Sequence, residues 1–272
     1  MTLYLELGAL LVVTGFVAGL IAGLLGLGGG IVLVPAYYFL FSALGYDSAH
    51  LMQICVATSL ATIVVTSLRS VQSHRRRGTV DMEILRRWAP GIVAGAVIGA
   101  LVAARLSSTV LLAIFGLLGM VVSAQMAFGG PKEVPEAHRL PGEPLRSVLS
   151  AAIGFLSVLM GIGGGSFGVP VLTLSGLSMH RAVGTAAGFG LLIAIPSTVS
   201  FALHGWGLTP KPPLSLGLVN VPAFAATIAM TLISAPLGVT LAHRLPARQL
   251  RRIFAVFLFL TAARMLMKAF GG

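Results

Sequence analysis

The chain has 272 residues, of which 57% are hydrophobic and 9% are charged, and its formal net charge is +11. So little charge and a mean hydropathy of +0.99 exclude a soluble globular domain and are typical of a polytopic membrane protein. The basic residues cluster between apolar segments, as in cytoplasmic loops, so we expect them to set orientation and contact membrane lipid, not nucleic acid. The single cysteine, Cys55, excludes a disulfide framework and a cysteine-based metal site.

Ten apolar segments, in two sets of five, are expected to form helices or half-helices. The first set lies at about 3–25, 31–44, 52–73, 88–104 and 109–128, and the second at about 145–160, 166–179, 181–203, 215–242 and 247–269. We therefore divide the chain into an N-terminal transmembrane repeat at 1–128, a polar cytoplasmic linker at 129–144 and a C-terminal transmembrane repeat at 145–272. No basic residue precedes the first segment, so we interpret it as a retained helix and not as a signal peptide.

Both sets contain the same glycine motif. Gly26–Gly30 and Gly161–Gly165 each read G-x-G-G-G, and each is followed, after three intervening residues, by Val-Pro. Glycine costs about 1 kcal/mol relative to alanine in a helix, so each motif predicts a helix break. The 14 residues from Ser147 to Met160 span about 21 Å as a helix, which is less than the roughly 30 Å hydrocarbon core. Each motif is therefore expected to form the tip of a broken or re-entrant hairpin near the middle of the membrane.

Further matches in the same order indicate an internal duplication. Gly78–Asp81 corresponds to Gly217–Asn220, and the stretch from Gly99 to Leu106 corresponds to that from Gly238 to Leu245. The basic loop after the third segment of the first set has no basic equivalent in the second, where the basic cluster follows the fourth segment. Parallel repeats keep basic loops at equivalent places, whereas inverted repeats exchange them, so the pattern favours inversion.

Charge also predicts the orientation. With the N-terminus outside, only Arg105, Lys211, Arg264 and Lys268 lie outside, which leaves 14 of the 18 Lys and Arg residues inside. The predicted fold is an all-α polytopic membrane protein of two inverted-topology repeats, each with a glycine-tipped hairpin and three further helices. Both termini are then expected to be periplasmic in a multi-pass protein of the bacterial inner membrane.

The glycine tips are the first candidate for a binding site. Free backbone amides at a helix N-terminus attract anions, and no carboxylate follows Glu143 or lies deep in an apolar segment of the first half, so an anionic substrate fits better than a cation. The alternative is that the glycines only allow helices to pack closely. The candidate residues are Gly28, Gly29, Gly30, Gly163, Gly164 and Gly165.

Polar side chains in neighbouring helices are further candidates. Hydroxyl and amide groups hydrogen-bond oxyanions, and the candidates are Thr58, Ser59, Thr185 and Gln53. Thr62 and Ser197 are further candidates. Taken singly, each could instead bond a neighbouring helix or its own backbone. His204 and His74, at opposite ends of corresponding helices, are candidates for proton coupling, with an interfacial position as the alternative. No metal-ligand spacing is present, and we expect neither a metal nor a cofactor.

On these residues the chain resembles the TauE/SafE sulfite exporter family. The likeness covers nearly the whole chain and rests on the paired glycine motifs, on Ala57-Thr58-Ser59, on Gly184-Thr185-Ala186 and on Gly78-Thr79-Val80-Asp81. Members are bacterial inner-membrane carriers of small sulfur-containing anions such as sulfite, sulfoacetate and other organosulfonates. The resemblance implies a secondary carrier, either exporter or uptake permease, and the sequence contains no ATP-binding segment. It also implies proton coupling, which no buried acid supports.

The sequence therefore predicts a secondary transporter of sulfite, sulfoacetate or other organosulfonates that works by alternating access. The alternatives are a carrier of another small anion and a non-transporting membrane assembly factor. An enzyme is not expected, because no nucleophile and base converge and the second half has no carboxylate to orient a histidine. The direction of transport, the coupling ion and a homo-oligomeric assembly stay open.

Overall fold

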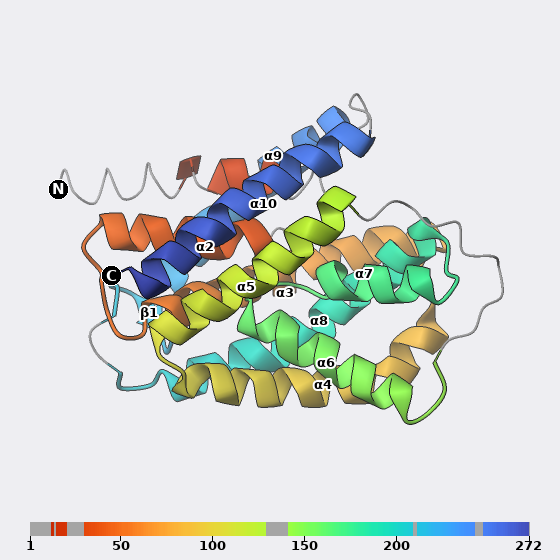
Figure 1. The fold of residues 1–272 in the computed structure, drawn as a ribbon, viewed down its shortest axis with the longest axis horizontal. Helices are drawn as coiled ribbons and strands as arrows, with labels where there is room; N and C mark the ends of the chain where they lie inside the picture. Colours follow the sequence, from red (N-terminus) through yellow and green to blue (C-terminus); the bar gives the residue numbers. More distant parts are fainter. Residues whose placement is uncertain are drawn as a thin grey trace.

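The computed structural model describes residues 12–13, 15–20, 30–128, 141–208, 211–242 and 247–271. Helices account for nearly all of the described secondary structure (Figure 1). They are α2 (Gly30–Ala43), α3 (Leu51–Arg76), α4 (Met82–Arg105), α5 (Ser108–Phe128), α6 (Leu145–Leu159), α7 (Gly165–Leu174), α8 (Met179–His204), α9 (Val221–Ala242) and α10 (Ala247–Phe270). Two short strands, β1 (Ser215–Leu216) and β2 (Val219–Asn220), pair antiparallel.

Five stretches are long and apolar enough to cross a membrane, among the described residues. They are α3, α4, α5, α8 and the Arg252–Phe270 part of α10. Large apolar side chains on α5 face outward, with Leu117 56% and Val121 62% exposed, as expected for a surface that contacts lipid tails. The protein is therefore an all-α multi-pass membrane protein.

Helices α6 and α7 form the broken hairpin that the second glycine motif predicts. Helix α6 has 15 residues and α7 has 10, so both are short for a membrane span. Gly161 between them has φ +62°, a left-handed conformation that favours glycine. The amides of Gly161 and Ile162 bond back to the carbonyls of Val158 and Ser157, both at 2.9 Å, which ends α6.

Helices α3 and α8 pack antiparallel. Thr58, near the start of α3, bonds the amide of Asn220, which follows the end of α8. Thr185, near the start of α8, bonds the amide of Asp81, which follows the end of α3. The two helices that correspond in the sequence duplication therefore run in opposite directions.

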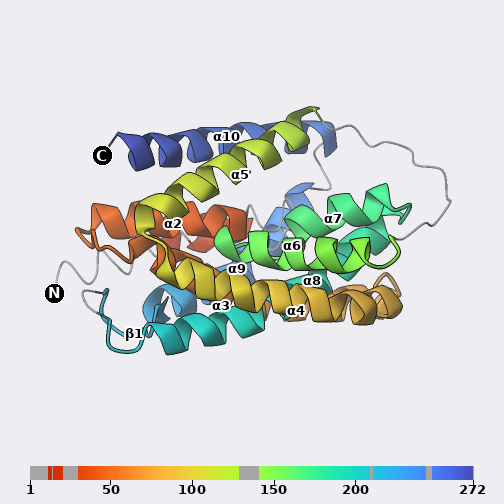
Figure 2. The same ribbon diagram turned by 60° about the horizontal axis from the view of Figure 1, so that its bottom comes forward.

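A second antiparallel pair, α5 and α10, lies along one flank of the molecule, and α4 and α6 lie along another (Figures 1 and 2). The Ser123 hydroxyl of α5 donates to the Ala255 carbonyl at 2.7 Å, while Gly116, earlier in α5, packs against Leu266, later in α10. Helices α4 and α6 contact through small residues, because a β-carbon on Gly95 would lie 2.0 Å from the Ala151 carbonyl oxygen.

Three helix boundaries differ from the apolar segments expected from sequence. Helix α4 begins at Met82, before the apolar run at 88, because the Asp81 carboxylate accepts bonds from the amides of Glu83 and Ile84 and caps the helix. Helix α9 begins at Val221 and not at 215, because the preceding residues form the β1–β2 hairpin. Helix α7 ends at Leu174, five residues early, and Gly176 follows with φ +90°.

Candidate functional site

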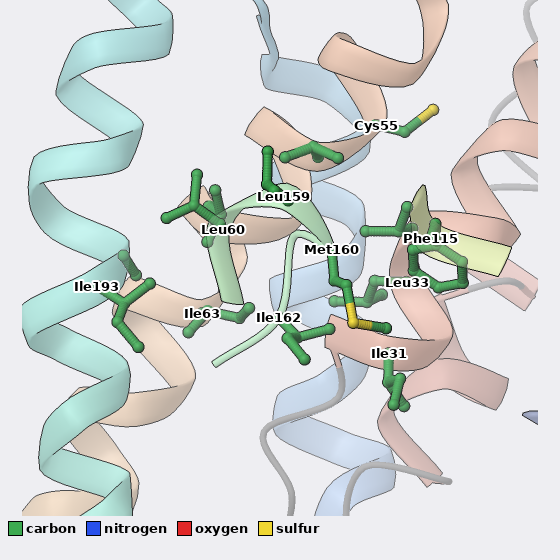
Figure 3. Packing of buried hydrophobic residues seen from close by; sticks show 14 of the residues in the cluster. Ile31, Leu33, Cys55, Leu60, Ile63, Phe115, Leu159, Met160, Ile162 and Ile193 are labelled. Atoms are coloured by element: carbon green, nitrogen blue, oxygen red, sulfur yellow. The ribbon is translucent and has the colours of Figure 1, made fainter. Parts of the chain in front are cut away.

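The tip of the α6–α7 hairpin lies in the hydrophobic core. Met160 and Ile162 are 0% and 1% exposed. Figure 3 shows both side chains among apolar side chains from other helices, including Ile31 and Leu33 of α2. The tip is thus enclosed by protein, which is where an irregular backbone is tolerated in a membrane.

The tip contacts the end of the first glycine motif. A β-carbon on Gly30 would lie 2.8 Å from the Gly161 carbonyl oxygen and 2.9 Å from the Ile162 α-carbon, so only glycine fits without a shift. The Ser59 hydroxyl of α3 donates to that same Gly161 carbonyl at 2.7 Å. Gly28 and Gly29 lie outside the described residues.

The first turn of α7 carries free amides. Gly163, Gly164 and Gly165 donate to no protein group in the part of the chain that the structure describes, and the first bond of the helix runs from the Gly168 amide to the Gly164 carbonyl at 2.8 Å. Such amides, together with the helix dipole, carry fixed partial positive charge. Chemically, this end of α7 can bind an anion.

A small cavity of about 30 Å³ opens beside these amides. This is room for one or two water molecules. Its lining residues are all uncharged and come from three helices and the tip: Thr66, Ser67 and Ser70 of α3; Val183, Ala186, Ala187 and Gly190 of α8; and Gly163, Gly164, Gly165 and Val169. Three of the glycines proposed from the sequence as binding residues, and three hydroxyl-bearing residues of α3, therefore line the same cavity.

Those three hydroxyl residues are absent from the candidates chosen by sequence. A signal was present for two of them, Thr66 and Ser70, because they continue a four-residue repeat from Thr58 and Thr62 along one face of α3. The predicted residues on this stripe lie earlier in α3, toward the other end of the helix from the cavity.

Thr58 and Thr185 bond the backbone at the two ends of the α3–α8 pair. Each hydroxyl oxygen accepts a bond of 3.0 Å, Thr58 from the Asn220 amide and Thr185 from the Asp81 amide. Asp81 also pairs with Arg181 at 2.6 Å, whereas Asn220 bonds the Pro213 carbonyl and the Ser215 hydroxyl, each at 3.1 Å. The two ends have the same backbone geometry, but only one has an ion pair.

The remaining predicted residues lie away from the cavity. Gln53 bonds the Leu106 carbonyl through its amide nitrogen and accepts a bond of 3.0 Å from the Ser108 hydroxyl, so it ties α3 to the α4–α5 turn. His74 shares a 3.0 Å bond with the Thr79 hydroxyl near the end of α3. His204 is exposed at the end of α8. None of the three lines the cavity.

A buried polar cluster joins α2, α3 and α9. The Tyr37 hydroxyl donates to the Thr227 hydroxyl at 2.7 Å and lies 3.5 Å from the Thr62 hydroxyl. By the sequence match, Thr62 and Thr227 correspond to Phe189 and Trp88, which stack with ring centroids 5.8 Å apart. The same position between helices is therefore polar in one half and aromatic in the other.

No cluster of three or more metal-ligating side chains occurs among the described residues. The chemistry available at the cavity is hydrogen-bond donation by backbone amides and hydroxyl groups. This suits the binding of a small polar or anionic ligand.

Comparison with known proteins agrees with a membrane transporter. Residues 11–265 match the model of a family described as sulfite exporter TauE/SafE. A "probable membrane transporter protein" of Haemophilus influenzae is 35% identical over 260 residues, covering 95% of this chain and 98% of the relative. Proteins of the same description from Bacillus subtilis and Methanocaldococcus jannaschii are 31% and 26% identical, covering 72% and 91% of this chain and 78% and 91% of their own lengths.

Proposed function

Because the chain belongs to the sulfite exporter TauE/SafE family of membrane transporters, we propose that it carries small sulfur-containing anions across the bacterial inner membrane. Sulfite, sulfoacetate and other organosulfonates are the substrates, and the N-terminal amides of α7 are the binding groups. The single observation that carries this proposal is the set of free amides at Gly163–Gly165 beside a small cavity.

Charge supports an anion at this position. A charged solute inside the membrane is costly unless fixed dipoles or opposite charges replace its hydration. The α7 amides supply such dipoles, and no carboxylate lines the cavity to repel an anion. Gly28–Gly30 form the matching half of the site in this proposal.

The antiparallel pairing of α3 with α8 and of α5 with α10 supports two inverted repeats, 1–128 and 145–272, joined by the linker at 129–144. Inverted repeats with broken helices at their interface suit alternating access by rocking of one part against the other. At about 30 Å³ the cavity has room for only one or two water molecules, so the cycle must enlarge it to admit a substrate. Both termini are then periplasmic, and His74 and His204 are the candidates for proton coupling.

Ligand-dependent stabilisation tests the proposal. The full chain is purified in detergent, and its melting temperature is measured with sulfite, sulfoacetate, taurine, sulfate and thiosulfate at constant ionic strength. A substrate at 100 times its Kd should stabilise the folded state by about 2.7 kcal/mol. An increase with sulfite or a sulfonate supports the proposal. No increase with any of the five would contradict it and favour a non-transporting assembly factor. An increase with sulfate alone would contradict sulfite and sulfonates as the substrates and indicate a carrier of a different anion.

A further inference from the structure

Ser67 is a buried residue of α3 whose hydroxyl has no protein partner among the described residues. The residue is 5% exposed and lines the same cavity as Gly163–Gly165. Among the described residues its hydroxyl makes no hydrogen bond, whereas those of Thr62 and Thr66 bond carbonyls of their own helix at 3.0 and 3.3 Å. The Ser67 oxygen is not one of the fully enclosed, unpartnered polar atoms, so it is open to the cavity and free to donate to a ligand or water there.

Gly190 places this hydroxyl beside the α7 amides. A β-carbon on Gly190 would lie 2.4 Å from the Ser67 side-chain oxygen and 3.8 Å from the Gly164 amide nitrogen. A larger residue at 190 would therefore occupy the space between the two groups. Because Gly190 has no side chain, the hydroxyl of α3 and the amide of α7 border the same small space, and no described side chain fills it.

The electrostatics of the cavity are unusual for an anion site, because every lining residue is neutral. The neighbouring cation, Arg69, is exposed and is not part of the lining. The cost of removing an ion from water rises with the square of its charge, so a dianion costs about four times as much as a monoanion of the same size. Attraction to neutral dipoles rises only in proportion to charge, so such a site favours monoanions.

We infer that Ser67 is a specificity-determining residue, which donates a hydrogen bond to an oxygen of a monoanionic oxyanion held by the α7 amides. The site then selects a singly charged sulfonate group, which in sulfoacetate is separate from the carboxylate, over a doubly charged oxyanion such as sulfate. This inference rests on the proposed function and adds to it the charge of the substrate and the side chain that recognises it.

Equilibrium binding to the purified full chain tests the inference, with methanesulfonate as the monoanion and sulfate as the dianion at equal ionic strength. The variants are Ser67→Ala and Gly190→Ala, which perturb the same space from opposite sides. Ser157→Ala is the matched control, because Ser157 is a buried serine whose hydroxyl is unpartnered but does not line the cavity. We expect methanesulfonate to bind the wild type at least tenfold more tightly than sulfate. Ser67→Ala should raise the methanesulfonate Kd about tenfold, the loss of one hydrogen bond to a charged ligand.

The outcomes separate the two proposals. A tenfold weaker affinity in Ser67→Ala and Gly190→Ala, with Ser157→Ala unchanged, supports the inference. Binding of methanesulfonate by the wild type with an unchanged Kd in Ser67→Ala overturns the role of Ser67 and leaves the proposed function standing. Equal or tighter binding of sulfate overturns the selection by charge. Binding of neither anion overturns the inference, and the proposed function then depends on the stabilisation measured with sulfite, sulfoacetate and taurine.

Discussion

The hydroxyl of Thr185 accepts a hydrogen bond of 3.0 Å from the amide of Asp81, 104 positions earlier in the chain. The same bond recurs between Thr58 and the Asn220 amide, 162 positions later. Each threonine therefore bonds the residue just before a helix that belongs to the other half of the chain: Thr185 before α4, and Thr58 before α9. A bond of this kind holds α3 and α8 in register at both ends.

Replacing Thr185 with valine should destabilise the fold. Valine has the same shape but no acceptor, so the Asp81 amide loses its partner at the start of α4, at a cost of about 1–3 kcal/mol. A lower melting temperature in detergent is the expected result. Thr173→Val is the control, since the Thr173 hydroxyl bonds only carbonyls of its own helix. Equal melting temperatures for the two variants would show that the bond to Asp81 contributes nothing.

The ion pair of Asp81 with Arg181 should contribute less than the cap that Asp81 provides. The Arg181 side chain is 47% exposed, and exposed pairs contribute about 0–1 kcal/mol. Asp81→Asn keeps a capping side chain, as Asn220 does at the start of α9, and should lose little stability. Asp81→Ala should lose about 1 kcal/mol more. Thermal melts of both variants compare the two losses of stability. A larger loss in Asp81→Asn than in Asp81→Ala would show that the ion pair contributes more than the cap.

Neighbouring glycines of the second motif should respond differently to alanine. A β-carbon on Gly164 would lie 2.4 Å from the β-carbon of Phe189, so Gly164→Ala forces α7 away from α8 and should cost about 1–3 kcal/mol. On Gly163 the nearest atom is the Ile63 side chain at 3.5 Å, an ordinary contact. Gly163→Ala should therefore melt close to the wild type. Similar losses at the two positions would mean that backbone conformation, and not packing, requires glycine here.

The Tyr37 hydroxyl should stabilise the contact between α2 and α9. Tyr37→Phe removes the donor to Thr227, and bonds between membrane helices contribute about 0.6 kcal/mol on average. We expect a small decrease in melting temperature. Tyr38→Phe is the control, because the Tyr38 hydroxyl makes no hydrogen bond among the described residues. A decrease of the same size in Tyr38→Phe would show that the bond from Tyr37 to Thr227 does not stabilise the contact between α2 and α9.

Hydropathy and glycine content were sufficient to predict the fold class and the α6–α7 hairpin, because both depend on local composition. Helix starts at Met82 and Val221 were harder to place, since the caps Asp81 and Asn220 are polar residues outside the apolar pattern. Hydropathy averages do not detect a single capping side chain.

The site was only partly predictable for a related reason. Gly163–Gly165, which line the cavity, stand out in the sequence as candidates because a glycine run has few uses inside a membrane. Ser67 could not be identified in this way, because a single serine on an apolar helix usually bonds its own backbone, and the sequence does not show that this one lies beside Gly190 of α8. Thr58 and Thr185 were recognised as a pair, but their partners come from distant parts of the chain.

Transport by Gly163→Val tests the central claim most directly. The β-carbon fits, and the two added methyl groups would fill a cavity of about 30 Å³ beside the α7 amides. The protein is reconstituted in liposomes, and the flux of sulfite and sulfoacetate is compared with that of the wild type and of Gly142→Val, whose position has no atom within 4 Å. We expect the wild type and Gly142→Val to transport at least one of the anions and Gly163→Val to lose more than 90% of that flux while inserting and melting normally. Undiminished flux in Gly163→Val would contradict a binding site at the second glycine motif.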